Sequence, residues 1–437
     1  MKVLILAAGR SKRMKPVEDK NFLKFLGKPL LQHQLEMLKM AGFREIIVIG
    51  GKHNLSRVKK MCAGLRGLKI KVCEQKNLEL GMCGAILSAK NLISQEPVLI
   101  LSSNDIVDTK AFKLIKEAAK NGKAESYILG KKVLKYFPGG YLKVDSKGYI
   151  QNIVEKPKQG SEPSNLVNLV VHVHKNPKKL IEYLKKSESK NDDRYEQALC
   201  SMIKDGVQMQ VVPYEGFWQP IKFPWHVQSV FQFLFASAKK GISKSAVISK
   251  NAVINGDVII GEHVKIFDGA VVAGPCYIGD GSIVATNSLV RESNIGENCV
   301  IGFNTEVARS YLGNDVWTHS NYIGDSVIEN NVSFGAGTVL ANLRLDEKNV
   351  CVNYDDDWID TGDNKFGAVI GSNTRIGVNT SIMPGTRIGG GSFIGAGIIV
   401  SENIPENSFV RGKFSLKISK NKENIEDTKR DNFKKKL

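Results

Sequence analysis

Short apolar runs alternate with amphipathic stretches along the first half of the chain. Continuous apolar runs predict buried strands, and apolar residues that recur every three or four positions predict helices. The expected strands are Val3–Leu6, Ile46–Ile49, Val98–Leu101 and Leu166–Val173. The expected helices lie at about 30–41, 82–93, 109–121 and 176–187. This alternation predicts an α/β layer fold with a mainly parallel sheet, in which ligands bind at the carboxyl ends of the strands.

From about Val247 onward an aliphatic residue recurs every six positions, with Gly, Asp or Asn crowding the positions between. The first in-register run comprises Ile248, Ile254, Ile260, Ile266, Val272, Ile278, Val284 and Val290. After one-residue shifts the register resumes at Ile295, Ile301 and Val307, then at Ile328, Phe334 and Leu340, and finally at Ile370, Ile376, Ile382, Ile388, Ile394 and Val400. This period predicts a parallel β-helix with the aliphatic residues pointing inward. Residues 343–366 break the repeat and are expected to leave the coil as a loop.

The 437 residues exceed one ordinary hydrophobic core, so at least two domains are expected. The two patterns place them at 1–237 and 243–410, followed by a basic tail, 411–437, that we expect to be disordered and to have no catalytic role. The apolar runs are too short to span a bilayer or to form a signal peptide, which predicts a cytoplasmic protein with no membrane partner. The seven cysteines are scattered and include no C-x-x-C pair, so they are expected to serve in packing.

The net charge of +18 is unevenly distributed along the chain. Residues 1–250 have a net charge of +23, residues 251–410 of −11, and the tail of +6. A basic first half suits nucleic acid or small anionic substrates. Because no nucleic-acid-binding motif accompanies the charge, we favour phosphorylated small molecules and expect no nucleic acid partner. Solvated surface lysines are the alternative.

The stretch from Val3 to Lys20 joins an apolar run to a small-residue turn, Ala7-Ala8-Gly9, and then to five cations: Arg10, Lys12, Arg13, Lys15 and Lys20. Backbone N–H groups and side-chain charges in such a turn can surround a polyphosphate. The alternative is a first strand followed by a basic surface loop.

With both halves considered, the chain resembles the bifunctional sugar-1-phosphate nucleotidylyltransferases with a left-handed β-helix acyltransferase domain. The nearest type is the N-acetylglucosamine-1-phosphate uridylyltransferase/glucosamine-1-phosphate acetyltransferase, including archaeal relatives that use UTP or dTTP. The family loop reads L-A-A-G-x-G-T-R-M, with a catalytic Lys seven residues after the Arg. Here Leu6-Ala7-Ala8-Gly9, Arg13-Met14 and Lys20 match that pattern, and Ser11-Lys12 replaces the Gly-Thr pair. The resemblance implies a Rossmann-like nucleotidyltransferase domain followed by a left-handed β-helix.

The resemblance assigns roles to residues in the first half. Leu6, Ala7, Ala8 and Gly9 would contact the nucleotide, and Arg13 and Lys20 would neutralise charge on the reacting phosphates. Asp105 resembles the ligand of a catalytic Mg²⁺; the alternative is that it caps the helix expected near Lys110. Base and sugar would contact a set of residues spread over several motifs, namely Gln75, Gly81, Gly140, Glu155, Lys156 and Asn168.

One departure concerns the second metal ligand. The family commonly reads W-x-D-x-G-x-P-W near the end of this domain, and its Asp binds the metal. Here Trp218 and Trp225 frame the same spacing, but Pro220 replaces the Asp. Lys222 is a candidate for supplying a fixed positive charge instead.

In the β-helix the sequence matches the family's acetyltransferase motifs H-x-x-Y-x-G-D and G-A-G-T-x-x-x-N, the latter followed six residues on by Lys. The resemblance makes His319 the general base and has Asn342 orient the amine or acetyl group. Tyr322 and Lys348 would hold the sugar phosphate, and the Ala336 N–H would contact the oxyanion. Ala308 replaces a family lysine, and Arg309 is the candidate substitute.

The implied activity is acetyl-CoA-dependent acetylation of glucosamine 1-phosphate, together with transfer of a nucleoside monophosphate from UTP or dTTP to a sugar 1-phosphate. The implied assembly is a homotrimer, with the acyl donor near Gly377 to Gly385. One alternative is a glucose-1-phosphate uridylyl- or thymidylyltransferase whose β-helix only oligomerises. Another is a non-catalytic assembly subunit built on the same folds.

Overall fold

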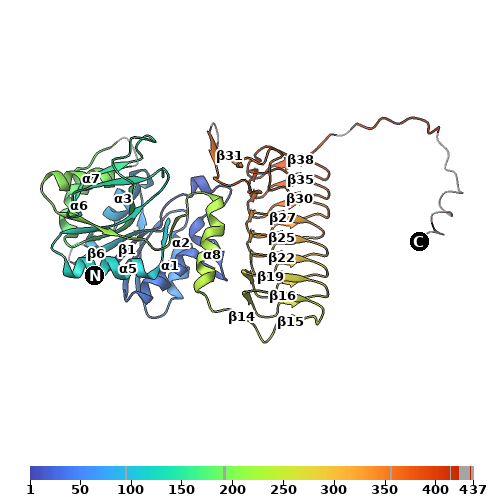
Figure 1. Ribbon diagram of the computed structural model, residues 1–437, viewed down its shortest axis with the longest axis horizontal. Coiled ribbons are helices and arrows are strands. Elements are labelled where there is room, and N and C mark those ends of the chain that lie inside the picture. Colours follow the sequence, from blue (N-terminus) through green and yellow to red (C-terminus); the bar gives the residue numbers. More distant parts are fainter. Residues whose placement is uncertain (94–95, 190–192, 355–356, 414, 423–433, 435–437) are drawn as a thin grey trace.

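The computed structural model describes residues 1–93, 96–189, 193–354, 357–413, 415–422 and 434. An N-terminal unit of strands and helices lies beside a stack of short parallel strands, and helix α8 (Val227–Ser237) runs between them (Figure 1). The disorder predicted for 411–437 falls mostly on residues outside the described ones. Within the described part of the chain, no helix combines the length and apolar character that crossing a membrane requires.

The N-terminal unit is built on one mixed sheet. Its parallel half contains β6 (Val98–Ser102), β1 (Lys2–Leu6), β4 (Glu45–Gly51) and β5 (Lys69–Gln75), in that order. β11 (Leu166–His174) then pairs antiparallel with β6, β8 (Ser126–Lys132) and β9 (Gly140–Val144). β9 pairs antiparallel with β10 (Ile150–Glu155), and β12 (Met209–Pro213) pairs parallel with β8.

The expectation of a mainly parallel sheet is therefore wrong for this second half. The described connections between β8 and β11 are residues 133–139, 145–149 and 156–165, none of which contains a helix. A parallel crossover needs about a dozen residues or more, whereas antiparallel neighbours can be joined by short turns.

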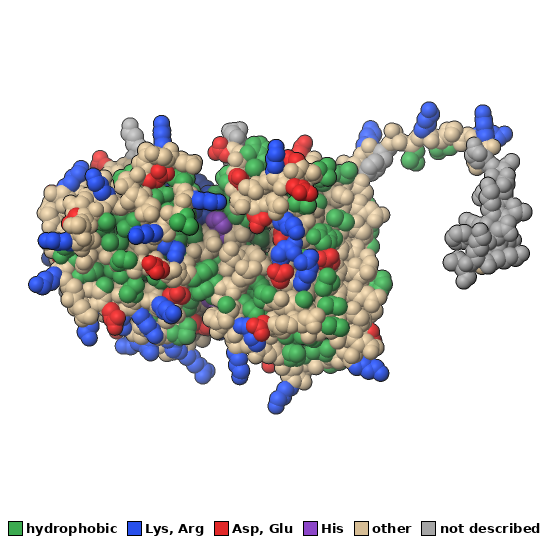
Figure 2. All heavy atoms as spheres, viewed as in Figure 1, with side chains coloured by type: hydrophobic (Ala, Val, Ile, Leu, Met, Phe, Trp, Pro, Cys, Tyr) green, Lys and Arg blue, Asp and Glu red, His purple; other side chains and the backbone are tan. Residues whose placement is uncertain are grey.

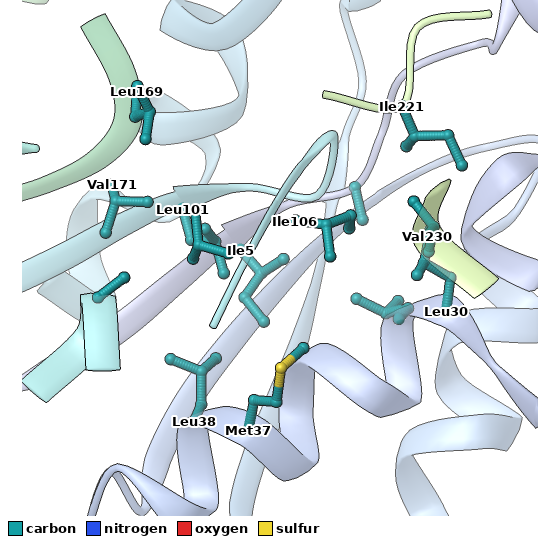
Figure 3. Close-up of a cluster of buried hydrophobic side chains, with 14 of the residues drawn as sticks. Ile5, Leu30, Met37, Leu38, Leu101, Ile106, Leu169, Val171, Ile221 and Val230 are labelled. Carbon is teal, nitrogen blue, oxygen red and sulfur yellow. The ribbon is translucent and has the colours of Figure 1, made fainter. Parts of the chain in front are cut away.

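The helices follow the predicted periodicity closely. α1 (Leu30–Met40), α5 (Thr109–Asn121) and α6 (Pro177–Lys186) lie where they are expected, and the helix expected over 82–93 is divided into α3 (Gly81–Ser88) and α4 (Lys90–Ile93). The sequence pattern did not predict α2 (Leu55–Ala63), α7 (Arg194–Lys204) or α8. Figure 3 shows side chains of α1, including Met37 and Leu38, packed toward Ile5 of β1 and Leu101 of β6.

The second half forms four parallel sheets that make up the three faces of a β-helix, with the third face divided into two sheets. The first face contains β14 (Gly241–Ile242), β17 (Val258–Ile260), β20 (Cys276–Ile278), β23 (Asn294–Ile295), β26 (Tyr311–Leu312), β28 (Val327–Ile328), β33 (Val369–Ile370) and β36 (Arg387–Ile388). The second contains β16 (Val253–Asn255), β19 (Val271–Ala273), β22 (Leu289–Arg291), β25 (Glu306–Ala308), β27 (Tyr322–Gly324), β30 (Val339–Leu340), β35 (Ser381–Ile382) and β38 (Ile399–Val400). The third contains β15 (Val247–Ile248), β18 (Lys265–Ile266), β21 (Ile283–Val284) and β24 (Val300–Ile301), then β29 (Ser333–Phe334), β34 (Arg375–Ile376), β37 (Phe393–Ile394) and β39 (Phe409–Val410).

The hexapeptide prediction is confirmed over most of its length, and only Ile248 and Ile254, in the first coil, are half-buried. The repeat residues from Ile260 to Val400 are buried, and Trp317 bridges the third face between Val300 and Ser333. Corner turns place a residue at positive φ, and Asn recurs there because it tolerates the left-handed region better than most residues. The Asn residues in this conformation are Asn287, Asn298, Asn304, Asn331, Asn373, Asn379 and Asn407.

The interruption at 343–366 leaves the coil, as expected, between β30 and β33. It contains an antiparallel hairpin of β31 (Cys351–Tyr354) and β32 (Asp357–Asp360), which projects toward the N-terminal unit in Figure 1. Val350, Val352 and Phe366 of this segment share a buried apolar cluster with the N-terminal unit. The two halves are thus packed through a common core rather than joined by a free linker.

The repeat makes a testable distinction between inward and outward aliphatic residues. Ile301 is fully buried in the coil, whereas 72% of Ile399 is exposed. We expect Ile301→Ala to lower the free energy of unfolding by about 2–5 kcal/mol, because it removes buried methylene groups and leaves a cavity. Ile399→Ala should change it by less than about 0.5 kcal/mol. Chemical denaturation of both variants followed by circular dichroism checks this, and equal losses would contradict the inward assignment.

Candidate active sites

A cavity of about 580 Å³ opens at the carboxyl ends of β1 and β6. Most of the residues predicted for the first site line it, namely Leu6, Ala8, Gly9, Arg13, Lys20, Gln75, Gly81, Asp105, Gly140, Glu155, Lys156 and Asn168. Ala7 lies beneath the cavity, where its carbonyl oxygen accepts hydrogen bonds from the side-chain amides of Asn21 and Asn54 at 3.3 and 3.0 Å. Figure 2 shows many other Lys and Arg side chains spread over the visible surface of this unit.

The loop after β1 is ordered by its own side chains. Ser11 has φ +52° and precedes a 3-10 turn, η1 (Lys12–Met14), which positions Arg13. A second turn, η2 (Lys20–Phe22), is capped by Asp19, whose carboxylate accepts from the Asn21 N–H at 2.9 Å. The Ser11 hydroxyl accepts a hydrogen bond from the Lys20 N–H at 3.4 Å. Ser11, where the sequence departs from the family motif, thus joins the two turns that hold Arg13 and Lys20.

Three cations line this part of the cavity. Lys20 Nζ donates to the Ile221 carbonyl at 3.2 Å, and burial, reinforced by the charge of Arg13, lowers the pKa of Lys20 to about 8. Burial likewise lowers the pKa of Lys222 to about 8. The Lys222 ammonium lies 4.2 Å from the centre of the Phe137 ring and donates to the Pro138 carbonyl at 3.0 Å. An anionic ligand would relieve the repulsion among these groups.

Asp105 begins β7 (Asp105–Val107), which pairs antiparallel with β13 (Trp218–Pro220). Its carboxylate accepts a hydrogen bond from the Trp218 indole at 2.8 Å, and burial raises its pKa. Pro220 lies directly opposite Asp105 in the register. The alternative role for Asp105 is wrong, because α5 is capped by Asp108, which accepts from the Ala111 N–H at 3.0 Å.

The opposite wall contains the residues predicted to hold the sugar. A Cβ at Gly140 would lie 2.8 Å from a carboxylate oxygen of Glu155 and 3.4 Å from the amide nitrogen of Asn168, so glycine leaves room for both side chains. Burial raises the pKa of Glu155, and the charge of Lys156, 3.6 Å away, opposes that shift. Gln75 donates to the Asn77 and Gly81 carbonyls at 3.0 and 2.8 Å and so holds the Gly81 turn.

Sequence reasoning missed a buried polar network behind Asn168. The Asn168 side-chain oxygen contacts His172 Nε2 at 2.8 Å, and His172 Nδ1 contacts the Tyr195 hydroxyl at 2.7 Å. That hydroxyl lies 3.0 Å from His174 Nε2, and His174 Nδ1 lies 2.9 Å from the Ser126 hydroxyl. Burial lowers the pKa of both histidines, so they are neutral near pH 7. The sequence did contain one indication of this network: His172 and His174 are two residues apart, which places both side chains on the same face of β11.

A second polar cluster lies on the β-helix at the carboxyl end of β27. Arg309 makes a bidentate ion pair with Asp325, with N···O distances of 2.6 and 2.8 Å. Asn342 donates to the same carboxylate. A Cβ at Gly324 would lie 2.6 Å from the Asn342 side-chain nitrogen and 2.7 Å from the Tyr322 hydroxyl. The structure thus brings together three predicted residues around Asp325, to which the sequence analysis gave no role.

The other predicted residues of this site lie elsewhere on the surface. His319 and Ala336 are exposed at the same corner of consecutive coils, where the Gly337 N–H donates to the Ser320 carbonyl at 2.8 Å. Within the described residues, the His319 imidazole has no hydrogen-bond partner. Lys348 is exposed on the segment that leaves the coil after Asn342. No described contact joins these three side chains to the Asp325 cluster.

Comparisons with known proteins cover almost the whole chain. A family model described as "Nucleotidyl transferase" matches residues 2–221, and one described as "GMPPB C-terminal domain" matches residues 237–350. The bifunctional sugar-1-phosphate nucleotidylyltransferase/acetyltransferase of Sulfurisphaera tokodaii is 34% identical over 388 residues, which cover 86% of this chain and 91% of that protein. The chain belongs to this bifunctional family.

A second relative agrees with that assignment. The bifunctional protein GlmU of Methanocaldococcus jannaschii is 30% identical over 429 residues, which cover 94% of this chain and 97% of that protein. A solved structure of a putative glucose-1-phosphate thymidylyltransferase from Bacillus anthracis has 21% identity and a TM-score of 0.48, covering 55% of this chain and 97% of that chain. The protein is therefore a nucleotidyltransferase and acetyltransferase, and a non-catalytic β-helix or assembly subunit is not favoured.

The nucleotidyltransferase cavity fits one divalent cation through Asp105. A single carboxylate together with substrate phosphate oxygens is a common arrangement for Mg²⁺. Pro220, opposite Asp105, has no side-chain ligand to offer. Among the described residues, no cluster of three or more His, Cys, Asp or Glu side chains could hold a metal without the substrate.

The lowered lysine pKa values predict a specific pH profile. Both Lys20 and Lys222 lose a proton as the pH rises through about 8, so the cavity loses positive charge above that pH. We expect kcat/KM for the nucleoside triphosphate to fall above pH 8, with a limiting slope steeper than one proton. Lys222→Met removes one of the two groups and should leave a slope of one. A profile that stays flat to pH 9.5 would contradict the role of these lysines.

Proposed function

We propose that this enzyme acetylates glucosamine 1-phosphate with acetyl-CoA and joins the N-acetylated sugar 1-phosphate to UMP from UTP, with dTTP as the alternative donor. The observation that supports this most strongly is that the two sets of residues, a cation-lined cavity and a β-helix with a histidine and an amide, occur in one polypeptide. We assign the nucleotidyltransferase domain to residues 1–237, the acetyltransferase domain to 243–410 and a tail to 411–437.

In nucleotidyl transfer, a phosphate oxygen of the sugar 1-phosphate attacks the α-phosphorus of the nucleotide, and pyrophosphate leaves from the opposite side. Both reactants are anionic, so holding them in line and neutralising charge are the main requirements. Arg13 and Lys20, on the two turns after β1, would do this. Mg²⁺ held by Asp105 would further neutralise the phosphates when bound.

Substrate selection is assigned to the two sides of the cavity. Leu6, Ala8, Gly9, Gln75 and Gly81 would contact the nucleotide, and Ala7 would support that wall from below. Because the Gln75 amide donates to the Gly81 turn, its side-chain oxygen is the atom offered to the base. Glu155 and Asn168 would bind sugar hydroxyls beside Gly140, and Lys156 would bind the sugar phosphate.

In acetyl transfer, the amine nitrogen attacks the thioester carbonyl, and the CoA thiolate leaves. His319 would accept the proton from the amine, and the Ala336 N–H would stabilise the oxyanion. Asn342 would orient the acceptor, with its amide fixed by Asp325. Tyr322, Arg309 and Lys348 would hold the sugar phosphate. A homotrimer, with the acyl donor near Gly377 to Gly385, would bring further coils to this surface.

Single substitutions should separate the two activities. Lys20→Met should lower pyrophosphate release from UTP and N-acetylglucosamine 1-phosphate by at least about 100-fold, because it removes a cation from the reacting phosphates. It should leave CoA release from acetyl-CoA and glucosamine 1-phosphate unchanged. Lys52→Met, at an exposed lysine after β4, is the matched control and should affect neither activity.

His319→Ala should show the opposite pattern, with CoA release reduced by about 100-fold to 10,000-fold, the usual contribution of a general base. His263→Asn alters another exposed histidine of the β-helix, whose φ of +55° Asn accommodates, and should leave both activities intact. If the unsubstituted enzyme releases neither pyrophosphate nor CoA with any sugar phosphate tested, the proposed function is wrong.

A further inference from the structure

The loop that bears Arg13 and Lys20 is attached to the β-helix along one line. Its residues contact β23, β26 and β36 of the first face and the residue that follows β28, in reverse chain order. The Leu26 N–H donates to the Asn294 side chain at 3.1 Å, and the Lys24 N–H donates to the Tyr311 hydroxyl at 2.9 Å. Farther along, the Glu18 N–H donates to the Glu329 carboxylate at 3.0 Å.

The contacts continue to the last strand of that face. Arg387, on β36, donates to the Lys15 carbonyl at 3.3 Å, and the Lys15 ammonium pairs with Glu406 at 2.8 Å. Each contact joins a residue of the N-terminal loop to a residue of the β-helix. The β-helix therefore supports the nucleotidyltransferase loop through contacts along its length.

The contact nearest the reacting groups comes from the hairpin inserted after Asn342. The Tyr354 hydroxyl donates to the carbonyl oxygen of Arg13 at 2.7 Å. The Tyr354 ring is held on one side by the Arg387 guanidinium, 4.1 Å from its centre, and on another by Phe223 and Trp225, with centroids 5.7 and 6.4 Å away. These contacts restrain the Tyr354 ring independently of the hydrogen bond to Arg13.

The side chain of Arg13 is restrained from the same cluster. Its guanidinium lies 5.5 Å from the centre of the Phe223 ring, and Phe223 stacks on Trp225 at 4.5 Å. Tyr354 therefore holds the backbone of Arg13 while the rings that contact Tyr354 hold its side chain. The Arg13 guanidinium must be correctly placed to neutralise charge that develops on the phosphates, because a small displacement weakens such stabilisation steeply.

We propose that Tyr354, a residue of the acetyltransferase half, is a positioning residue for nucleotidyl transfer that acts through Arg13. This inference rests on the proposed function of the first site. The hairpin of β31 and β32 then has a role in the reaction of the other domain. Its base lies beside the second site, where the Phe366 N–H donates to the Asn342 carbonyl at 2.9 Å.

The test is Tyr354→Phe in the full chain, which removes the hydrogen bond to Arg13 and keeps the ring. We expect kcat for pyrophosphate release to fall about fivefold to tenfold, the usual effect of losing one hydrogen bond. KM for the sugar 1-phosphate, CoA release and the thermal midpoint should not change. Trp358→Phe, at a side chain of β32 that is 69% exposed, is the matched control and should behave like the unsubstituted enzyme.

A double-mutant cycle with Arg13→Lys shows whether the effect passes through Arg13. In the Arg13→Lys background, Tyr354→Phe should change kcat by less than twofold. An unchanged kcat for Tyr354→Phe alone, or an equal fall in both activities together with a lower thermal midpoint, would overturn the proposal. Failure of the proposed function would differ from this, because the unsubstituted enzyme would then release no pyrophosphate at all.

Discussion

The nucleotidyltransferase site depends on holding like charges close together around a cavity, with Lys20 buried, Lys222 half-buried and Arg13 exposed. Arg13, Lys20 and Lys222 line one cavity, and repulsion between cations grows as the local dielectric falls. In a flexible loop, the cations would move apart and so relieve this repulsion. Here three sets of contacts hold the loop. Ser11 joins its two turns, the Ile221 carbonyl accepts a hydrogen bond from the Lys20 ammonium, and the β-helix contacts its outer side. Burial, reinforced by the charge of Arg13, lowers the pKa of Lys20, and a bound polyphosphate would favour its charged form.

The acetyltransferase surface is organised differently. Its half-buried cation Arg309 is paired with Asp325, which also accepts a hydrogen bond from Asn342, so the cluster is balanced without a ligand. His319 and Lys348 face solvent instead. The first site is thus pre-formed around an expected negative charge, whereas the second presents separate groups on an open surface. A substrate or a neighbouring subunit would have to bring those groups into a common environment.

The sequence predicted regular features far better than contacts between distant segments. The β-helix could be predicted residue by residue, because each interior position accepts only a compact apolar side chain. β5 and β10 were missed because polar residues such as Lys71 and Asn152 interrupt their apolar pattern at the exposed faces. Within the sites, the resemblance of single segments to family motifs indicated Arg13, Lys20 and Asp105. Asp325, Tyr195 and Tyr354 act through partners in other segments, and no local pattern encodes such pairs.

The contacts along the first face fix the position of the catalytic loop along the axis of the β-helix. Strands in such a stack are spaced by about 4.8 Å, so each coil sets one fixed step along the axis. Asn294, Tyr311 and Glu329 occupy three successive steps, and Arg387 lies two steps beyond Glu329, with β33 between them; together they contact the loop from Leu26 back to Lys15. A coil inserted between Asn294 and Arg387 would shift every later contact by one step. The contacts of the nucleotidyltransferase loop therefore require a fixed number of coils in this interval.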